Sequence, residues 1–192
     1  GADMRIISGQ LKGRRLKAPK GREVRPTADR VKEALFNILP HDLSGRRVLD
    51  LFAGTGNLSL EAMSRGAERA VLVDIAREAT ELIAENLKAV GCHGKARVVT
   101  GSAFKTARSL ARSGESFDLI FLDPPYEKGL AGEALKEIAK ESLLGENGVA
   151  VAEHSVREKV EERYGPLALV DQRRYGGTQL SFFRHSEVGD KK

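Results

Sequence analysis

The 192-residue sequence predicts an α/β protein with a doubly wound, mostly parallel sheet. Three observations point to this class. Apolar runs of four to seven residues alternate with helix-like segments from Arg47 onward, a glycine-rich turn follows the first run, and two strand-like runs joined by Gly176-Gly177 end the chain. Parallel strands need crossover helices, whereas a Gly-Gly turn favours a hairpin. We therefore expect seven strands with an antiparallel C-terminal pair.

The elements are expected in the following order. Residues 5–8 predict a short strand and residues 9–25 loops or a hairpin, and Thr27 is a candidate N-cap for a helix that Pro40 stops. Further strands are expected at 48–52, 70–74, 96–100, 117–122, 148–153, 167–175 and 178–184. Further helices are expected at 58–65, 78–90, 103–112, 132–141 and 156–163.

Composition bounds the organisation of the chain. We expect a small basic β/helical extension over residues 4–44, one main domain over 45–186 and a disordered tail over 187–192. Residues 1–3, before Met4, are expected to be a cloning remnant. No run of 18 apolar residues exists, no secretion signal is visible, and Cys92 has no partner for an intramolecular disulfide. These features predict a cytoplasmic protein that does not contact a membrane, and we expect a monomer.

Positive charge is concentrated at the N-terminus. Residues 4–32 hold ten Lys/Arg against two acidic residues, whereas residues 33–192 hold 22 against 24. Such a run is commonly a solvated, solubilising arm. Here the basic run is interleaved with glycines and a proline and precedes a helix. Binding to nucleic-acid phosphate is therefore a serious alternative to the solubilising role.

A glycine turn follows the first predicted strand. Residues 50–56 are Asp-Leu-Phe-Ala-Gly-Thr-Gly, and Asp74 ends the next strand 18 residues after Gly56. Glycines at this place let a ligand approach the backbone, and an acid at about this offset can bind ribose hydroxyls. The pattern indicates a cofactor that contains adenosine. The structural alternative is a tight turn that Asp50 caps.

The chain lacks the motifs of two other classes of nucleotide-binding protein, which narrows the choice of cofactor. Ser59 stands where a dinucleotide motif has its third glycine, and no glycine-rich turn here ends in Gly-Lys-Ser/Thr. The acid Asp50 suits a cationic amine better than a pyrophosphate. S-adenosylmethionine carries such an amine and no phosphate.

A rigid corner follows the strand at 117–122. Its residues are Asp123-Pro124-Pro125-Tyr126, and prolines fix the backbone in advance. An exocyclic base amine is a poor nucleophile because its lone pair is delocalised into the ring. Asp123 and the carbonyl of Pro124 could accept its two N–H bonds, while Tyr126 could stack on the base. The alternative is an irregular turn in which Asp123 satisfies a backbone amide.

Other chemistries are disfavoured. Methylation of a pyrimidine carbon needs a thiolate, and Cys92 lies far from the corner in sequence. Four scattered histidines and one cysteine do not make a zinc-ligand pattern, so no metal is expected.

The motifs at 50–56 and 123–126 resemble those of class I S-adenosylmethionine-dependent amino-methyltransferases, which have a Rossmann-like sheet. The segments 5–14 (RIISGQLKGR) and 25–37 (RPTADRVKEALFN) resemble, more narrowly, the RsmD family of bacterial 16S ribosomal RNA guanine-N2 methyltransferases. The resemblance covers nearly all of residues 4–184. It implies methylation of 16S rRNA in the small ribosomal subunit.

The resemblance also implies residue roles. The cofactor residues it implies are Asp50, Phe52, Ala53, Gly54, Thr55, Gly56, Asp74, Ile75, Ser102, Ala103 and Asp123. Many relatives have an acid before the Ala-Phe at 103–104, where this chain has Ser102, a weaker acceptor for the adenine amine. Asp123, Pro124, Pro125 and Tyr126 would receive the guanine, and Arg14, Arg15, Arg25, Thr27 and Arg30 would lie at the RNA.

Three rival functions remain at this point. A DNA adenine-N6 or cytosine-N4 methyltransferase meets the same chemical problem, although no insertion large enough for a target-recognition domain is visible. A non-catalytic RNA-binding module is disfavoured by the intact Gly54, Gly56, Asp74 and Asp123. An NAD-dependent oxidoreductase is disfavoured by Ser59 and the corner.

Overall fold

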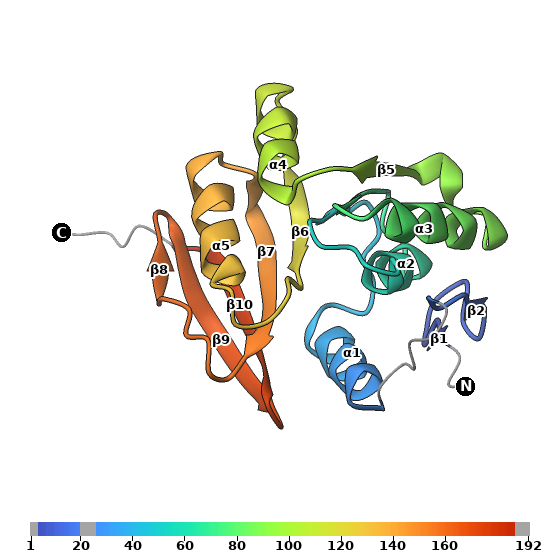
Figure 1. Cartoon of the computed structure of the whole chain (residues 1–192), viewed down its shortest axis with the longest axis horizontal. Helices are drawn as coiled ribbons and strands as arrows, with labels where there is room; N and C mark the ends of the chain where they lie inside the picture. The colour runs from blue at the N-terminus through green and yellow to red at the C-terminus, as the bar shows by residue number, and fades with distance from the viewer. Residues whose placement is uncertain (1–3, 20–25, 187–192) are drawn as a thin grey trace. The chain divides into compact units, whose positions relative to one another are not determined.

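The computed structural model describes residues 4–19 and 26–186, and the chain divides into two compact units between residues 102 and 103. Figure 1 labels the helices and strands of both units. The single main domain expected over 45–186 remains a prediction. No helix in the described ranges is long and apolar enough to span a membrane.

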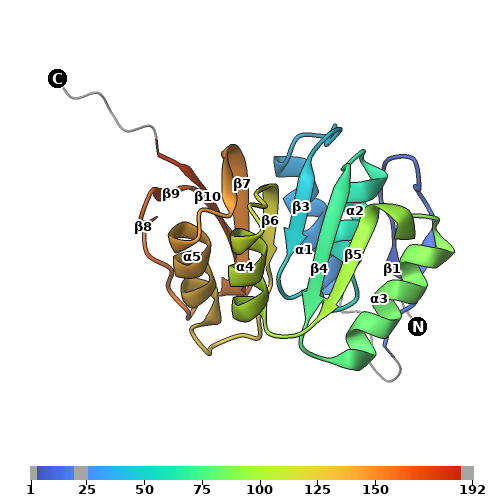
Figure 2. The same ribbon diagram turned by 90° about the horizontal axis from the view of Figure 1, so that it is seen from above.

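The first unit contains three parallel strands in the order β5-β4-β3. They are β3 (Arg47–Asp50), β4 (Arg69–Asp74) and β5 (Ala96–Thr100), which Figure 2 shows side by side. The crossovers are α2 (Asn57–Ser64), then α3 (Arg77–Ala89) with the short 3₁₀ helix η1 (His93–Lys95). Because the strands run parallel, their carboxyl ends share one edge, which brings Asp50, Asp74 and Thr100 to it.

The N-terminal arm, defined here as residues 4–19, forms a small hairpin of its own. The strands β1 (Met4–Arg5) and β2 (Arg15–Leu16) pair antiparallel. The strand expected over 5–8 is shorter in the structure and ends at Arg5. The N–H groups of Ile7 and Ser8 donate to the buried Glu61 carboxylate and not to the backbone of a neighbouring strand.

Helix α1 (Pro26–Ile38) follows the undescribed residues 20–25. Thr27 was expected to cap this helix, but it is the second helical residue. Proline suits the first position because the N–H that it lacks would find no partner within the helix there. The helix ends before Pro40, as expected. Its buried face includes Val31, Leu35 and Phe36.

The second unit joins parallel and antiparallel strands in the order β6-β7-β10-β9-β8. The helices are α4 (Ala103–Arg112) and α5 (Leu130–Lys140), and the strands are β6 (Phe117–Leu122), β7 (Leu144–Ser155), β8 (Arg163–Tyr164), β9 (Leu167–Tyr175) and β10 (Thr178–His185). β6 and β7 are parallel, whereas β9 and β10 form the expected antiparallel hairpin.

The helix expected over 156–163 was wrong. This segment is a turn that leads into β8, where Tyr164 is buried and pairs with Leu167. Its backbone bonds are local or go to the hairpin: Val156 donates to Gly177, and Glu161 donates to the Tyr164 hydroxyl. Val156 and Val160 are too few apolar residues to give a helix a buried face.

The predicted α/β class is confirmed, with a mostly parallel sheet and antiparallel C-terminal strands. Apart from the β1–β2 hairpin of the arm, the described residues contain three strands in the first unit and five in the second, which gives eight rather than the expected seven. The additional strand is β8, whose two residues are too short to give a periodic signal.

Candidate functional site

The glycine turn between β3 and α2 has two glycines with different tasks. Gly56 (φ +80°) packs tightly, since an added Cβ would lie 3.3 Å from the Ile83 side chain. Gly54 (φ +57°) has no atom within 4 Å of the place where a Cβ would stand. Ala53 donates its N–H to the Val73 carbonyl at 2.8 Å, which attaches the turn to β4. The backbone at Gly54 is therefore accessible to a ligand.

Asp50 is the last residue of β3, and only one of its two buried carboxylate oxygens has a hydrogen-bond partner. The Ser59 hydroxyl donates to Oδ2 at 2.8 Å, while Oδ1 is buried and has no hydrogen-bond partner. Burial raises the pKa of Asp50 to about 7, partly opposed by the Ser59 hydrogen bond. An unpaired buried carboxylate oxygen favours a cationic donor, so this residue fits the amine of S-adenosylmethionine.

Asp74 holds the turn against the end of β4. Its Oδ2 accepts the N–H of Gly54 at 2.9 Å, and its Oδ1 accepts that of Ala76 at 2.9 Å. Each carboxylate oxygen has a further lone pair available to a ribose hydroxyl. Ile75 is 74% exposed at the same edge, an apolar surface that could cover an adenosine.

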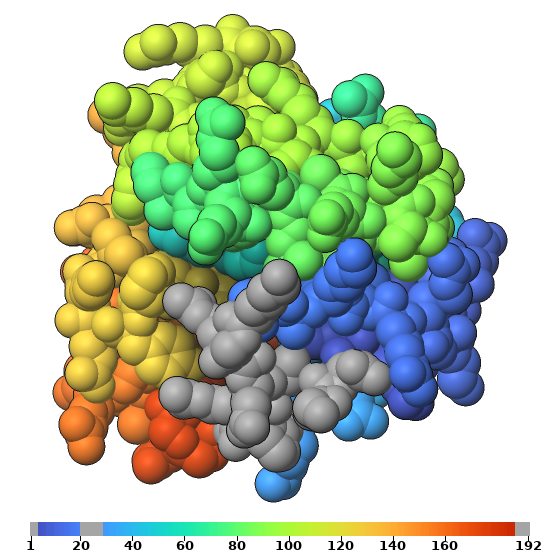
Figure 3. All heavy atoms as spheres, turned by 45° about the vertical axis from the view of Figure 1, so that its right-hand side comes forward, coloured from blue at the N-terminus to red at the C-terminus, as the bar shows by residue number. Residues whose placement is uncertain are grey.

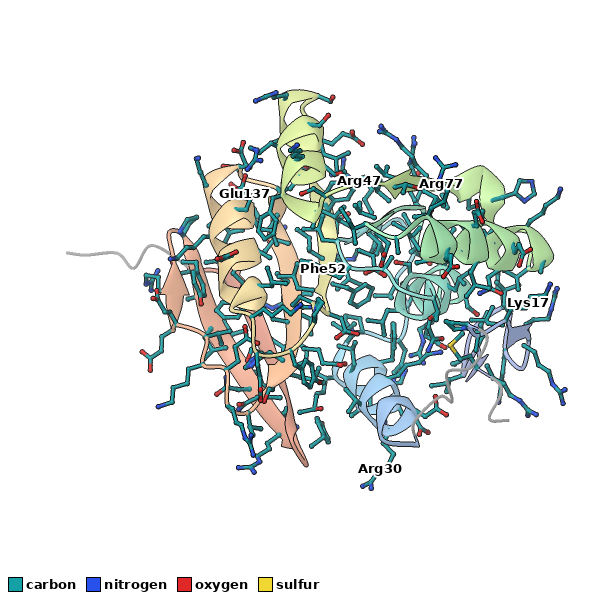
Figure 4. The ribbon with its side chains drawn as sticks, viewed as in Figure 1. Lys17, Arg30, Arg47, Phe52, Arg77 and Glu137 are labelled. Carbon is teal, nitrogen blue, oxygen red and sulfur yellow. The ribbon has the colours of Figure 1, made fainter. Side chains whose placement is uncertain are left out.

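The remaining cofactor residues lie along the same segments. Phe52, labelled in Figure 4, is half-buried in the turn with Ala53 and Thr55. Gly101 donates its N–H to the Asp74 carbonyl at 2.9 Å, which brings Ser102 to the end of β4. Ser102 directly precedes α4, whose first residue, Ala103, is buried. The structure thus brings Asp50, Asp74 and Ser102 to one strand edge, and their cofactor roles remain predictions.

Binding of the cofactor amine should depend on the charge of Asp50. A cationic ligand binds the ionised carboxylate, so affinity should rise as pH increases through about 7. At pH 6 we expect S-adenosylmethionine binding to release up to about one proton, measured by calorimetry in buffers of different ionisation enthalpy. An Asp50→Asn variant should bind more weakly without this proton release. Equal proton release by the variant would remove Asp50 from the cofactor site.

Asn86 joins the N-terminal arm to the glycine turn. This buried side chain on α3 accepts the N–H of Lys17 at 2.8 Å and donates to the Lys17 carbonyl at 3.0 Å. It also donates to the Thr55 carbonyl at 3.4 Å. In Figure 3 the blue atoms of the arm border the green atoms of α3.

A buried ionic cluster fixes the start of the arm. Glu61 on α2 is fully buried and accepts hydrogen bonds from the N–H groups of Ile7 and Ser8. Its carboxylate is also paired with Arg65 at 3.0 Å and with Lys32 at 3.1 Å. Burial lowers the pKa of Lys32, although the charge of Glu61 opposes this. The ammonium of Lys32 also donates to the Asn57 side chain and the Arg5 carbonyl.

Of the residues assigned to RNA, Arg14, Arg15 and Arg30 lie on exposed parts of the first unit, and the exposure of Thr27 lies outside what is described. Arg14 and Arg15 are exposed, and Arg14 donates to the carbonyl of Ala89 at the end of α3, at 2.6 Å. Figure 4 shows Arg30 projecting away from α1. Arg25 lies outside the described residues. These RNA roles remain predictions.

The proline corner follows β6 in the second unit. Asp123 is half-buried, Pro124 is buried and Pro125 is exposed. Tyr126 is 40% exposed, and its hydroxyl lies 2.9 Å from Thr178 Oγ1 and 3.3 Å from Glu153 Oε2. Burial raises the pKa of Tyr126 to about 12, so the phenol keeps its proton at neutral pH. The side chain of Tyr126 is therefore held through its hydroxyl by residues of β7 and β10.

Three elements of the site were missed from the sequence. Ser59 was used only to exclude a dinucleotide motif, yet its hydroxyl binds Asp50. Glu153 is the acid that ends the apolar run of the strand predicted over 148–153, a signal that could have identified it. The Lys32–Glu61 pair had a weaker signal, a charged residue within the apolar helix α2. No cluster of three or more metal-binding side chains occurs within 4–19 and 26–186.

Comparison with known proteins gives the family. The family model described as "Conserved hypothetical protein 95" matches residues 4–184. "Putative rRNA methyltransferase YlbH" of Bacillus subtilis is 39% identical over 181 residues, covering 94% of this chain and 98% of that protein. "Ribosomal RNA small subunit methyltransferase D" of Escherichia coli is 37% identical over 153 residues, covering 80% and 75%.

A solved structure agrees with these relatives. "Putative methyltransferase yhhF from Escherichia coli" superposes with a TM-score of 0.84 at 32% identity, covering 96% of this chain and 98% of that one. The family match spans nearly the whole chain, and both relatives exceed 30% identity. The chain therefore belongs to the family described as conserved hypothetical protein 95, the RsmD family of methyltransferases.

Proposed function

We propose that this protein transfers the methyl group of S-adenosylmethionine to the N2 amine of a guanine in 16S rRNA, within the small ribosomal subunit. The coarser statement follows from the family: the chain is an S-adenosylmethionine-dependent rRNA methyltransferase. The base, the atom and the assembled subunit are our proposal.

The single observation that carries the proposal is the arrangement of acceptors at the proline corner. Asp123 follows β6 directly, and Tyr126 is held through its hydroxyl by Thr178. An amine bound to a carboxylate through one N–H and to a backbone carbonyl through the other has its lone pair localised toward the methyl donor. A preorganised pair of acceptors therefore lowers the barrier by orientation and by stabilising positive charge on nitrogen.

The residues of the first unit would hold the cofactor, which supplies an activated methyl group on a sulfonium. Asp50 would bind its amine through the unpaired Oδ1, and Asp74 its ribose hydroxyls. Gly54 leaves room for close approach to the backbone. No covalent enzyme intermediate is needed, because the amine nitrogen would form its bond to the methyl carbon as the carbon–sulfur bond breaks. The sulfonium would leave as a neutral thioether, and the methylated nitrogen would lose one proton to solvent.

The basic arm would contribute most of the RNA affinity. A base amine in folded RNA is accessible only when the nucleotide is unpaired or extruded, because the major groove of an A-form helix is deep and narrow. A chain of 192 residues has little surface for sequence readout. Recognition of the shape of an assembled ribonucleoprotein by the arm and α1 is therefore our preferred hypothesis.

Reversing the charge of the arm tests this contribution. The double change Arg14→Glu with Arg15→Glu should weaken binding to small subunits and reduce the salt slope of log K by roughly one to two. The matched control is Lys136→Glu with Lys140→Glu on the exposed part of α5, which changes the net charge equally. Thermal unfolding checks that loss of the Arg14–Ala89 bond leaves the fold intact. Equal slopes for the two double variants would make the arm a solvated extension.

The proposed function is tested by identifying the labelled nucleoside. The protein is incubated with methyl-labelled S-adenosylmethionine and, separately, with small subunits lacking the modification, their deproteinised RNA, and duplex DNA. We expect label on guanine N2 in subunits, found by mass spectrometry. Label only on DNA adenine or cytosine would favour the DNA methyltransferase alternative and overturn the proposal.

A further inference from the structure

We propose that Glu153 is a positioning residue of the transfer reaction, holding Asp123 by a hydrogen bond from its own protonated carboxyl and Tyr126 by accepting a hydrogen bond. This inference rests on the proposed role of Asp123 as the acceptor for the base amine. It adds a residue from β7 to a corner that the sequence confines to 123–126.

The sheet register brings the two carboxyl groups together. In the parallel pair β6 and β7, Leu122 lies opposite Ala152. The next residues along the two chains are Asp123, directly after β6, and Glu153, within β7. Their side chains are hydrogen-bonded to each other. The Tyr126 hydroxyl also donates to Glu153 Oε2 at 3.3 Å.

Hydrogen bonding between two carboxyl groups requires a proton on one of them, since ionised carboxylates only accept. Burial raises the pKa of Glu153, although its hydrogen bonds with Asp123 and Tyr126 and the charge of His154 oppose the rise. The proposed role of Asp123 requires an ionised acceptor, so we assign the shared proton to Glu153. The titratable groups that act on it are Asp123, Tyr126 and His154. Across β10 its opposite residue is the apolar Leu180, which offers no compensating charge.

The arrangement gives each group one task. Protonated Glu153 would donate to Asp123 and orient its carboxylate, which would accept the base amine. Tyr126, whose pKa is about 12, remains a donor to Glu153. When Glu153 loses its proton at higher pH, two adjacent carboxylates repel each other and Asp123 loses the bond that orients it. The rate should therefore decline with rising pH.

Two substitutions separate this role from a merely structural one. Glu153→Gln keeps a neutral group that can donate to Asp123 and accept from Tyr126, whereas Glu153→Ala removes both bonds. We expect Glu153→Ala to lower kcat about 10²-fold, with KM for the cofactor changed less than about threefold. Glu153→Gln should recover the rate to within about fivefold and lose the decline at higher pH. The control is Glu146→Ala, an exposed acid on the same strand, which should behave as wild type.

The outcomes distinguish failure of this inference from failure of the proposed function. If wild type labels guanine but Glu153→Gln shows the wild-type pH profile, or is as slow as Glu153→Ala, the inference is overturned and the function stands. If wild type labels no guanine, the function fails, and the inference is decided by carbon-13 NMR of the Glu153 carboxyl in the free protein. A titration midpoint above the ordinary glutamate range supports the shared proton, and an ordinary midpoint overturns it.

Discussion

Replacing Asp123 by alanine is expected to lower the rate of methyl transfer by about 10²–10³-fold while leaving the affinity for S-adenosylmethionine within about threefold. The carboxylate would accept an amine hydrogen bond that strengthens as positive charge develops on nitrogen, so the loss falls on kcat. The other residues predicted to bind the cofactor, which except for Ala103 are on the first unit, are unchanged. Single-turnover labelling of small subunits measures the rate, and calorimetry measures cofactor affinity.

A matched control uses Asp171, a half-buried acid of the same unit that pairs with Arg173 at 3.1 Å. Asp171→Ala should leave both the rate and the affinity near wild type, since this pair is at the surface. If Asp123→Ala instead abolished cofactor binding in a folded protein, Asp123 would belong to the cofactor site and not to the base. A rate within about threefold of wild type would refute its role in transfer.

Replacing Glu61 by alanine is expected to lower the free energy of unfolding by about 3–5 kcal/mol. The substitution leaves two buried cations, Lys32 and Arg65, without their shared carboxylate. It also removes the acceptor for the N–H groups of Ile7 and Ser8, so the arm should detach locally. Urea denaturation measures the stability, and amide exchange at Ile7 and Ser8 measures the attachment of the arm.

The control for this prediction is Glu85→Ala in the same unit. Glu85 pairs with Lys17 at 3.8 Å, and the two side chains are 60% and 73% exposed, so its loss should cost less than about 1 kcal/mol. A Glu61→Ala variant as stable as Glu85→Ala would show that the buried cluster does not stabilise the fold. Unchanged exchange at Ile7 and Ser8 would show that the arm is attached by other contacts.

Strong apolar periodicity made much of the fold predictable. The strands β5 and β6 and the helix α4 have the expected bounds, because apolar runs or spacing and flanking polar residues mark both ends. The hairpin between β9 and β10 was equally clear from Gly176-Gly177. Other boundaries moved by one to a few residues, as helix and strand ends commonly do.

The errors share a physical cause, which is competition from distant partners. Ile7 and Ser8 leave the strand because Glu61, more than fifty residues away, binds their amides. Residues 156–163 form a turn because Val156 bonds to Gly177 of the hairpin and Tyr164 is buried in β8. Local spacing contains no information about either partner.

Residues of the candidate site could be predicted where the local sequence pattern alone marks them. Asp50, Asp74 and Asp123 were identified because each is an acid at the end of an apolar strand. Ser59, Asn86 and Glu153 were not assigned site roles, because their importance depends on partners brought together only by folding. Strand register, in particular, is what brings Glu153 to Asp123.

The most direct test of the account is nucleoside analysis of 16S rRNA from an Escherichia coli strain that lacks its own small subunit methyltransferase D. The strain is supplied with this chain or with its Asp123→Ala variant at equal protein level. We expect the 16S rRNA to contain more N2-methylguanosine with the wild-type chain than with the variant. Equal N2-methylguanosine with both proteins, or methylation of another nucleoside alone, would contradict the proposed function.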